Sequence, residues 1–216
     1  SRRQRQMCIR DSVNDAEKIM SDHIVLAIGH SARDTFEMLA KTPLTMQPKD
    51  FAVGYRVQHF QEQIDESQYG KQDKTCREAL GAASYKLTAQ TKDGRGVYSF
   101  CMCPGGYVVN ASSEKGRLAV NGMSYHDRGS GVANAAIIMT VTKEDFPDQS
   151  PLGGVAFQRE LEERAFQLAD GKIPVQSLGD FKRHEERLTE HNAVLIKNGS
   201  DCGLSLIHIS EPTRLA

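Results

Sequence analysis

The chain has 216 residues, a formal net charge of −1 at pH 7 and 39% hydrophobic residues, which suits one or two globular domains with a buried core. No apolar run reaches the roughly 18 residues of a membrane-spanning helix, and we predict no signal peptide or membrane partner. The charge is balanced and no basic patch is concentrated, which argues against nucleic-acid binding. Cysteines without a paired framework favour a reducing compartment, so we predict a cytoplasmic protein.

The two ends, residues 1–12 and 204–216, lack apolar periodicity and resemble translated transposase-type sequencing adaptors. The matching words are Met-Cys-Ile-Arg-Asp-Ser at Met7–Ser12 and Leu-Ser-Leu-Ile-His-Ile at Leu204–Ile209. Both ends are therefore predicted to be adaptor-derived tails and do not contribute to the functional argument. Without them 22 of the 27 basic and 26 of the 28 acidic residues remain, a net charge of about −4. The interior is expected to be a fragment of a longer protein.

Residues 22–40 predict a strand, a tight glycine turn and a helix. The apolar run "HIVLAI" is typical of a strand buried on both faces of a parallel sheet, and Gly29 ends it. Ser31, followed three residues later by Asp34, indicates a helix N-cap with a capping box. The amides of such a helix start suit a phosphate or a nucleotide edge. The same pattern also serves ordinary α/β packing.

From about residue 50 the hydrophobic period changes to two, which predicts a mostly antiparallel sheet of about six strands. The candidate strands are "FAVGYRVQH", "SYKLTAQ", "GVYSFCM", "YVVNA", "RLAVNG" and "AAIIMTVT". Turn signals separate them at Asp93-Gly94, Pro104-Gly105-Gly106, Lys115-Gly116 and Asn121-Gly122. A helical insert is predicted near 60–69, and a loop or short helix around 71–80. Residues 151–169 predict an amphipathic helix that covers the sheet, "PVQSLGDF" predicts a loop, and residues beyond 182 are unassigned.

Cys101 and Cys103 are the weak candidates for catalysis. In a regular strand they point to the same face, and a disulfide between them requires the strand to distort. The pair is one residue short of a Cys-x-x-Cys motif, and no further ligands complete a zinc site, so no metal is predicted. Buried structural thiols are the favoured interpretation, with a catalytic thiol or a structural role facing a cofactor as alternatives.

Pro104, Gly105 and Gly106 predict a tight turn, because proline presets φ and the following glycine permits a positive φ. The second glycine leaves backbone amides that a flat ligand can approach; a plain hairpin turn is the alternative. His30, His59 and His126 are interpreted as structural, hydrogen-bonded residues. "HEERLTEH" at 184–191 has Leu188 where a zincin helix has its second histidine. The sequence contains no Gly-x-Ser-x-Gly and no P-loop.

Several long sequence segments between residues 22 and 181 resemble those of the uncharacterised FAD-dependent dehydrogenase family of bacteria. Members of this family are flavoproteins with a glutathione-reductase-like FAD-binding fold. They include "VLAIGHSARDTFEML", "FAVGYRVQH", "GRGVYSFCMCPGGYVVNASSE" and "PLGGVAFQRELEERAF". The resemblance implies an oxidoreductase with noncovalent FAD, a small-molecule substrate and NAD(P)H as a candidate reductant. It implies a fragment of a Rossmann-like FAD-binding domain at 13–48 and an inserted, mostly antiparallel β domain covered by helices at 49–181. Residues 182–203 are unplaced.

The resemblance also implies where this chain contacts the cofactor. The candidate residues are Ile28, Gly29, His30, Ser31 and Arg33 in the first segment and Pro104, Gly105 and Gly106 in the second. The polar residues Arg56, Asn121 and Asn134 are candidates for the wall of a substrate cleft, with ordinary surface or turn positions as the alternative. The family's Gly-x-Gly-x-x-Gly unit and its glycine-rich C-terminal segment are absent, so the chain alone is expected to bind FAD poorly and to be inactive. The alternatives are a non-catalytic ligand-binding β module and a thiol-dependent enzyme using Cys101 or Cys103.

Overall fold

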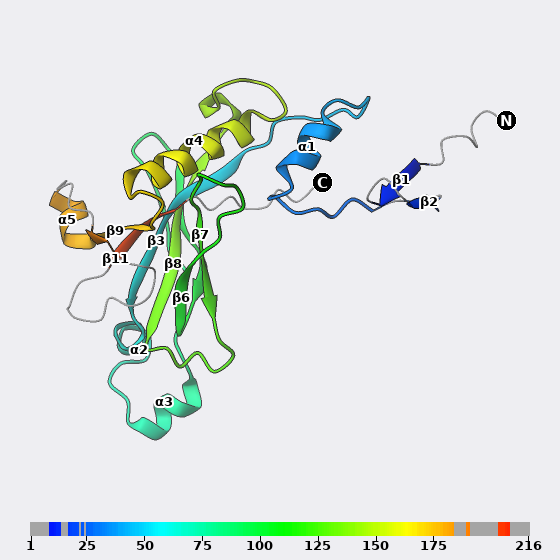
Figure 1. The fold of residues 1–216 in the computed structure, drawn as a ribbon. Helices are drawn as coiled ribbons and strands as arrows, with labels where there is room; N and C mark the ends of the chain where they lie inside the picture. Colours follow the sequence, from blue (N-terminus) through cyan, green and yellow to red (C-terminus); the bar gives the residue numbers. More distant parts are fainter. Residues whose placement is uncertain are drawn as a thin grey trace. The chain divides into compact units, whose positions relative to one another are not determined.

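The computed structural model describes residues 9–13, 17–21, 23, 25–183, 189–190 and 203–207. The chain divides into two units, Ser1–Ala32 and Arg33–Ala216. In the first unit, strand β1 (Ile9–Val13) pairs with β2 (Glu17–Ser21) in antiparallel register. The labelled helices and all other strands belong to the second unit (Figure 1).

The second unit is built on a seven-stranded sheet in the order β10-β9-β11-β3-β8-β5-β4. Its strands are β3 (Phe51–Phe60), β4 (Thr88–Gln90), β5 (Gly96–Cys103), β8 (Val132–Val141), β9 (Pro174–Ser177), β10 (Thr189–Glu190) and β11 (Gly203–Ile207). Every neighbouring pair is antiparallel. A separate antiparallel pair consists of β6 (Gly106–Asn110) and β7 (Val120–Ser124). The predicted mostly antiparallel architecture is confirmed.

The centre of the sheet is the long pair β3–β8, whose register runs without a break from Phe51↔Val141 to Phe60↔Val132. Strand β8 is buried along most of its length because other elements cover both of its faces. Small side chains permit this packing, since Ala133, Ala135 and Ala136 are fully buried. One apolar cluster on the sheet comprises Ala52, Ala136 and Ile138, packed against Tyr98 and Phe100.

Helices lie around this framework, and α3 lies beyond one end of the strands (Figure 1). They are α1 (Arg33–Leu39), α2 (Gln61–Tyr69), α3 (Lys74–Leu80), α4 (Gly153–Leu168) and α5 (Leu178–Arg183). The amphipathic helix predicted over 151–169 is confirmed as α4, and the insert near 60–69 is confirmed as α2. Ala165 of α4 packs with Val108, Leu118, Val120 and Ile173, while Phe157 packs with Phe51 and Phe146.

The predicted strand "HIVLAI" is wrong for the residues that the structure describes. Residues 25–28 are irregular, and Val25 is 89% exposed. A strand buried on both faces needs a paired neighbour on each side, and no described strand pairs with this segment. The predicted N-cap is also wrong. Helix α1 begins at Arg33, and the Ser31 hydroxyl instead contacts the ring of His30 at 3.3 Å.

Three other local predictions need correction. "PVQSLGDF" is not a loop, because β9 and α5 occupy it; Ser177 Oγ accepts a hydrogen bond from the Asp180 amide at 3.0 Å and starts the helix. Asn121-Gly122 is not a turn and lies inside β7. "SYKLTAQ" is a strand only over its last three residues, Thr88–Gln90.

The two ends do contain regular elements, contrary to their lack of sequence periodicity. Residues 9–12 lie in β1 and residues 204–207 lie in β11. The adaptor origin of 1–12 and 204–216 and the domain limits at 13–48, 49–181 and 182–203 stay predictions. Most of the "HEERLTEH" segment lies outside the described residues. Among the described residues, no helix combines the length and apolarity needed to cross a membrane.

Replacing Ile138 by alanine should lower the free energy of unfolding by about 2–5 kcal/mol, because its side chain is fully buried in the centre of the sheet. Chemical denaturation followed by circular dichroism measures this. Leu87→Ala is the matched control, since Leu87 is 58% exposed and its truncation should cost within about 0.5 kcal/mol. Equal costs for the two variants would contradict this assignment of the core.

Candidate functional site

The Cys-Pro-Gly-Gly segment forms the tight turn between β5 and β6, and packing explains both of its glycines. Gly105 has a φ of 53°, in the left-handed region that favours glycine. A Cβ atom added there would lie 1.7 Å from the carbonyl oxygen of Arg128. A Cβ atom on Gly106 would lie 2.9 Å from that of Cys103. The predicted turn and its positive φ are confirmed.

Protein groups hold the backbone of this turn, which is buried. Three hydrogen bonds of 2.8 Å do so: Gly105 N–H to Gln61 Oε1, Ser124 Oγ to the Pro104 carbonyl, and Asn134 Nδ2 to the Gly106 carbonyl. These three backbone groups of the turn therefore already have protein partners. Contact of Pro104, Gly105 and Gly106 with FAD stays a prediction.

Arg56 of β3 lies beneath this hairpin with no exposed surface. Its Nη1 donates to the Cys101 carbonyl at 2.8 Å and to Asn134 Oδ1 at 2.7 Å, and lies 3.7 Å from Cys103 Sγ. Its Nη2 donates to Asn121 Oδ1 at 2.9 Å. Its Nε is buried and has no partner among the described residues. We call Arg56, Asn121, Asn134, Cys101 and Cys103 the Arg56 network.

The acceptors around Arg56 are neutral. None of the described residues gives it a carboxylate partner, although burying an ion costs several kcal/mol when its charge is not compensated. Burial lowers the pKa of Arg56, and the nearby Cys103 opposes that shift. A guanidinium nevertheless stays protonated in proteins. The network thus holds a positive charge in a region of low dielectric, which strengthens its effect on nearby anions.

Gly122 makes room for the Arg56 network. A Cβ atom at this position would lie 2.2 Å from Asn134 Oδ1 and 2.4 Å from Arg56 Nη1. No side chain other than hydrogen fits there while both groups keep their positions. Because Asn121-Gly122 was predicted to be a turn, Gly122 was not identified from the sequence as the residue that faces the buried guanidinium.

Cys101 and Cys103 do not occupy a regular strand. The β5–β8 register shifts between Phe100 and Cys103, and Cys101 has a φ of 43°. Cys101 is exposed and Cys103 is half-buried, so the expectation of two buried thiols is wrong for Cys101. Cys103 Sγ donates to the Cys101 carbonyl at 3.3 Å. Among the described residues, no group of histidine, cysteine and acidic side chains could hold a metal ion.

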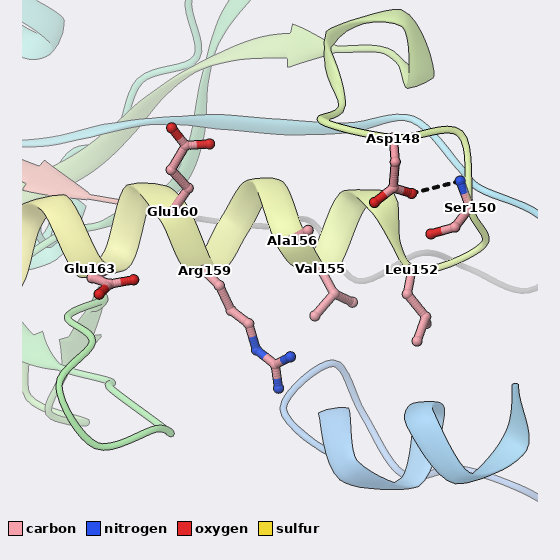
Figure 2. Close-up of a pocket in the computed structure, with 8 residues that line it drawn as sticks. All are labelled: Asp148, Ser150, Leu152, Val155, Ala156, Arg159, Glu160 and Glu163. Carbon is pink, nitrogen blue, oxygen red and sulfur yellow. Dashed lines mark hydrogen bonds between the residues drawn. The ribbon is translucent and has the colours of Figure 1, made fainter.

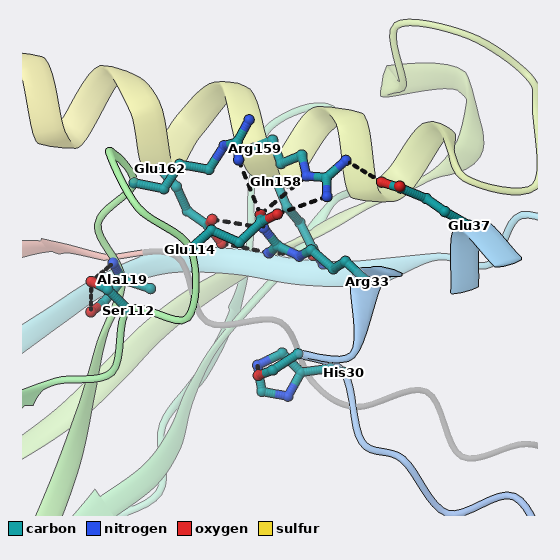
Figure 3. Close-up of polar contacts among 11 residues, drawn as sticks. His30, Arg33, Glu37, Ser112, Glu114, Ala119, Gln158, Arg159 and Glu162 are labelled. Carbon is teal, nitrogen blue, oxygen red and sulfur yellow. Dashed lines mark hydrogen bonds and ion pairs between the residues drawn. The ribbon is translucent and has the colours of Figure 1, made fainter. Parts of the chain in front are cut away.

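A second polar cluster anchors α1 to α4 and to the loop before β7 (Figure 3). Arg33 is buried and its Nη2 donates to Glu162 Oε1 at 2.6 Å, while its Nη1 also binds Glu114. Arg159 Nη2 binds Glu114 at 2.7 Å, and its Nη1 binds Glu37 at 2.7 Å. Burial opposes the charge of Arg33, but Glu162 and Glu114 outweigh it and raise the pKa of Arg33.

This cluster gives Arg33 structural partners in place of the predicted cofactor contact, which stays untested. Ile28, Gly29, His30 and Ser31 belong to the first unit, whereas Pro104, Gly105 and Gly106 belong to the second. Contact of both groups with one FAD stays a prediction. Sequence reasoning missed Glu162 and Gln158 because both lie on the helix face expected to be polar, yet both are buried.

The other predicted histidines have separate surroundings. His59 Nε2 lies 2.9 Å from the hydroxyl of Tyr85, so its interpretation as a hydrogen-bonded residue is confirmed. Burial lowers the pKa of His59, and a bond to its own backbone opposes the shift. His126 is exposed. Neither residue makes a hydrogen bond to the Arg56 network among the contacts of the described residues.

Surface hollows lie at two places among the described residues. One, of about 410 Å³, lies along α4 (Figure 2) and is lined by Asp148, Ser150, Leu152, Val155, Ala156, Arg159, Glu160 and Glu163. The other, of about 690 Å³, lies at the β4–β5 edge and is lined by Lys86, Thr88, Ala89, Gln90, Gly96, Val97 and Tyr98. Neither contains a predicted cofactor residue.

The described residues do not by themselves fit a whole FAD. The hairpin amide that was expected to face the flavin is bonded to Gln61, and the Arg128 carbonyl closes the space beside Gly105. Arg33 is occupied by carboxylates. The sequence has no glycine-rich phosphate-binding loop of the Gly-x-Gly-x-x-Gly type. No reaction step through the flavin follows from these residues.

Comparison with known proteins places the second unit in a family. Residues 50–205 match the family described as "FAD-dependent protein, C-terminal domain-like". The chain belongs to this family. A protein of Clostridium beijerinckii (strain ATCC 51743 / NCIMB 8052), described as an uncharacterized protein, is 52% identical over 174 residues. The match covers 79% of this chain and 32% of that protein, so the chain spans about a third of its relative's length. The FAD-dependent resemblance is confirmed at the level of the family, and the dehydrogenase assignment stays a prediction.

Gly122→Ala should destabilise the protein by about 1–3 kcal/mol, because the new methyl group overlaps Arg56 and Asn134. Gly96→Ala is a matched control in a neighbouring strand, where the nearest atom to a new Cβ is 3.6 Å away. Thermal unfolding of the two variants and the parent chain measures the difference. A Gly122→Ala protein as stable as Gly96→Ala would show that the buried guanidinium is not packed as described.

Glu114→Gln should destabilise the protein in a pH-dependent way. Hydrogen bonds from Arg159 hold the pKa of Glu114 at about 2, with Arg33 adding to the shift and partial burial opposing it. Because this value is below the ordinary 4.5, the stabilisation is complete above pH 4.5 and is lost as the pH falls toward 2. The wild type should exceed the variant by about 1.5–3 kcal/mol at pH 7.

Urea unfolding of the Glu114→Gln and wild-type proteins between pH 2 and pH 7 follows this difference. Glu78→Gln is the control, because Glu78 is 69% exposed and its contact with Lys74 is 3.8 Å long; it should change stability by less than about 0.5 kcal/mol. A Glu114→Gln effect that is constant across the pH range would contradict the ion-pair account.

Proposed function

We propose that this chain is the C-terminal domain of a FAD-dependent oxidoreductase and that its Arg56 network forms one wall of the substrate cleft. The proposal is supported by the family match and carried by one observation, a fully buried guanidinium that has only neutral acceptors among the residues that the structure describes. FAD supplies the transfer of electrons in such a protein. The role proposed for this domain is to bind and orient the small molecule that reacts.

The Arg56 network reaches the surface through Asn121, which is exposed while its amide oxygen accepts from Arg56. A negative charge placed outside Asn121 would feel an arginine charge that no described carboxylate cancels. At about 8 Å and an effective dielectric constant of about 20, the attraction is about 2 kcal/mol. The proposed substrate is therefore a small anion, such as a carboxylate, or a group that becomes negative during the reaction.

Flavin itself is proposed to be held mainly by residues other than those of this chain. The chain of 216 residues, purified in the presence of FAD, should retain no stoichiometric flavin absorbance after desalting. The full-length protein purified in the same way should be yellow. One tightly bound flavin per chain in the short protein would contradict the proposal that other residues hold the flavin, because the described residues offer no site for it.

Arg56→Met in the full-length protein should weaken binding of benzoate, a small carboxylate probe, by about thirtyfold, since about 2 kcal/mol of attraction is lost. Arg56→Lys keeps the charge and should retain most of the affinity, which separates electrostatics from packing. Isothermal titration calorimetry measures both, and flavin content should not change.

Arg164→Met is the matched control for these variants, because Arg164 is 72% exposed and pairs only with Glu160 on its own helix among the described residues. Its benzoate affinity should equal that of the parent protein. Equal affinities of Arg56→Met and Arg164→Met, with both proteins folded, would refute the role of Arg56 in binding anions.

A further inference from the structure

Strand β5 is distorted by a bulge at the place where a bridge between Cys101 and Cys103 would form. In a regular strand, residues two apart are separated by about 6.5–7 Å, whereas disulfide Cα atoms most often lie about 5.5–6 Å apart. From Phe100↔Ala136 to Cys103↔Asn134, β5 advances by three residues while β8 advances by two. A bulge of this kind bends the strand, and the left-handed φ of Cys101 belongs to that bend. Cys103 Sγ already lies 3.3 Å from the carbonyl oxygen of Cys101.

The two thiols differ in their access to solvent. Cys101 is exposed, whereas Cys103 is half-buried, lies against Gly106 and is 3.7 Å from Arg56 Nη1. A reagent from solution therefore meets Cys101 first. Cys103 is positioned behind it, as expected for a second thiol that resolves an intermediate formed on the first.

We propose that Cys101 and Cys103 form a reversible dithiol–disulfide redox site whose oxidant is a low-molecular-weight disulfide such as oxidised glutathione. The thiolate of Cys101 attacks one sulfur of the reagent, forms a mixed disulfide and releases the first small thiol. The thiolate of Cys103 then attacks the Cys101 sulfur and releases the second small thiol. The protein dithiol loses two electrons and two protons, and the reagent disulfide gains them.

Formation of the bridge acts on the Arg56 network. The Cys101 carbonyl accepts from Arg56 Nη1, and Cys103 Sγ contacts the same nitrogen. A ring closed through both side chains changes the conformation of the peptide that carries this carbonyl. Because no described carboxylate can replace the lost acceptor, the oxidised protein should unfold at a lower temperature than the reduced protein. This site does not depend on the proposed binding of anions or of FAD.

Mass spectrometry of the wild-type chain tests the proposal directly. The tryptic peptide 96–115 contains both cysteines and no internal lysine or arginine. After incubation with oxidised glutathione and alkylation of remaining thiols, this peptide should carry no label and should be lighter than its reduced form by two hydrogen atoms. Dithiothreitol should restore two labels. A peptide that keeps both labels, or that retains glutathione on Cys101, would overturn the proposal.

Three variants test the order of attack. Cys103→Ser should trap glutathione on Cys101, whereas Cys101→Ser should react at Cys103 at least tenfold more slowly, and circular dichroism confirms that each is folded. Cys76→Ser is the control, because Cys76 lies in α3 and outside the bulge; its peptide 96–115 should oxidise as in the wild type. Similar rates for Cys101→Ser and Cys103→Ser would reject the assigned roles.

Discussion

The positive charge of Arg56 is the constraint on which the centre of this domain depends. A guanidinium is a planar fork of donors, so a buried one fixes the positions of several acceptors at once. Here the fork reaches the bulge of β5 through Cys101, the middle of the sheet through Asn134 and the second sheet through Asn121. Gly122 follows from the same constraint, because a side chain there would occupy the space that the guanidinium fills.

Arg33 and Arg56, both buried in the described part of the domain, have their charges satisfied in different ways. Arg33 is surrounded by Glu114 and Glu162, so its field is largely cancelled, and its effect is to fasten α1 to α4. Arg56 has neutral acceptors only among the described residues, so its field persists at the surface. A compensated charge exerts little force on a ligand, whereas an uncompensated one is available to it. This difference, more than burial itself, distinguishes the candidate site from the structural cluster.

Sequence patterns predicted those features that depend on neighbours along the chain. The strands β3 and β5, the helix α4 and the positive φ of Gly105 were predicted from local patterns, and the structure confirms these elements and this φ. Sequence patterns gave wrong predictions where the burial or conformation of a residue depends on contacts with residues far away in the sequence. Glu162 is buried where it pairs with Arg33, which is far away in the sequence. The apolar run before Gly29 is irregular in the structure because no described strand pairs with it.

The Arg56 network also links the two proposals for this domain. The Cys101 carbonyl is shared between the bulge that carries the thiols and the guanidinium that would face an anion. If closing the disulfide displaces Arg56 and so weakens anion binding, the coupling acts in both directions. Binding of an anion that orders Arg56 then favours the dithiol over the disulfide by the same factor. The redox state of two cysteines and the affinity for a charged small molecule would thus be set by one buried side chain, through contacts that need no change elsewhere in the sheet.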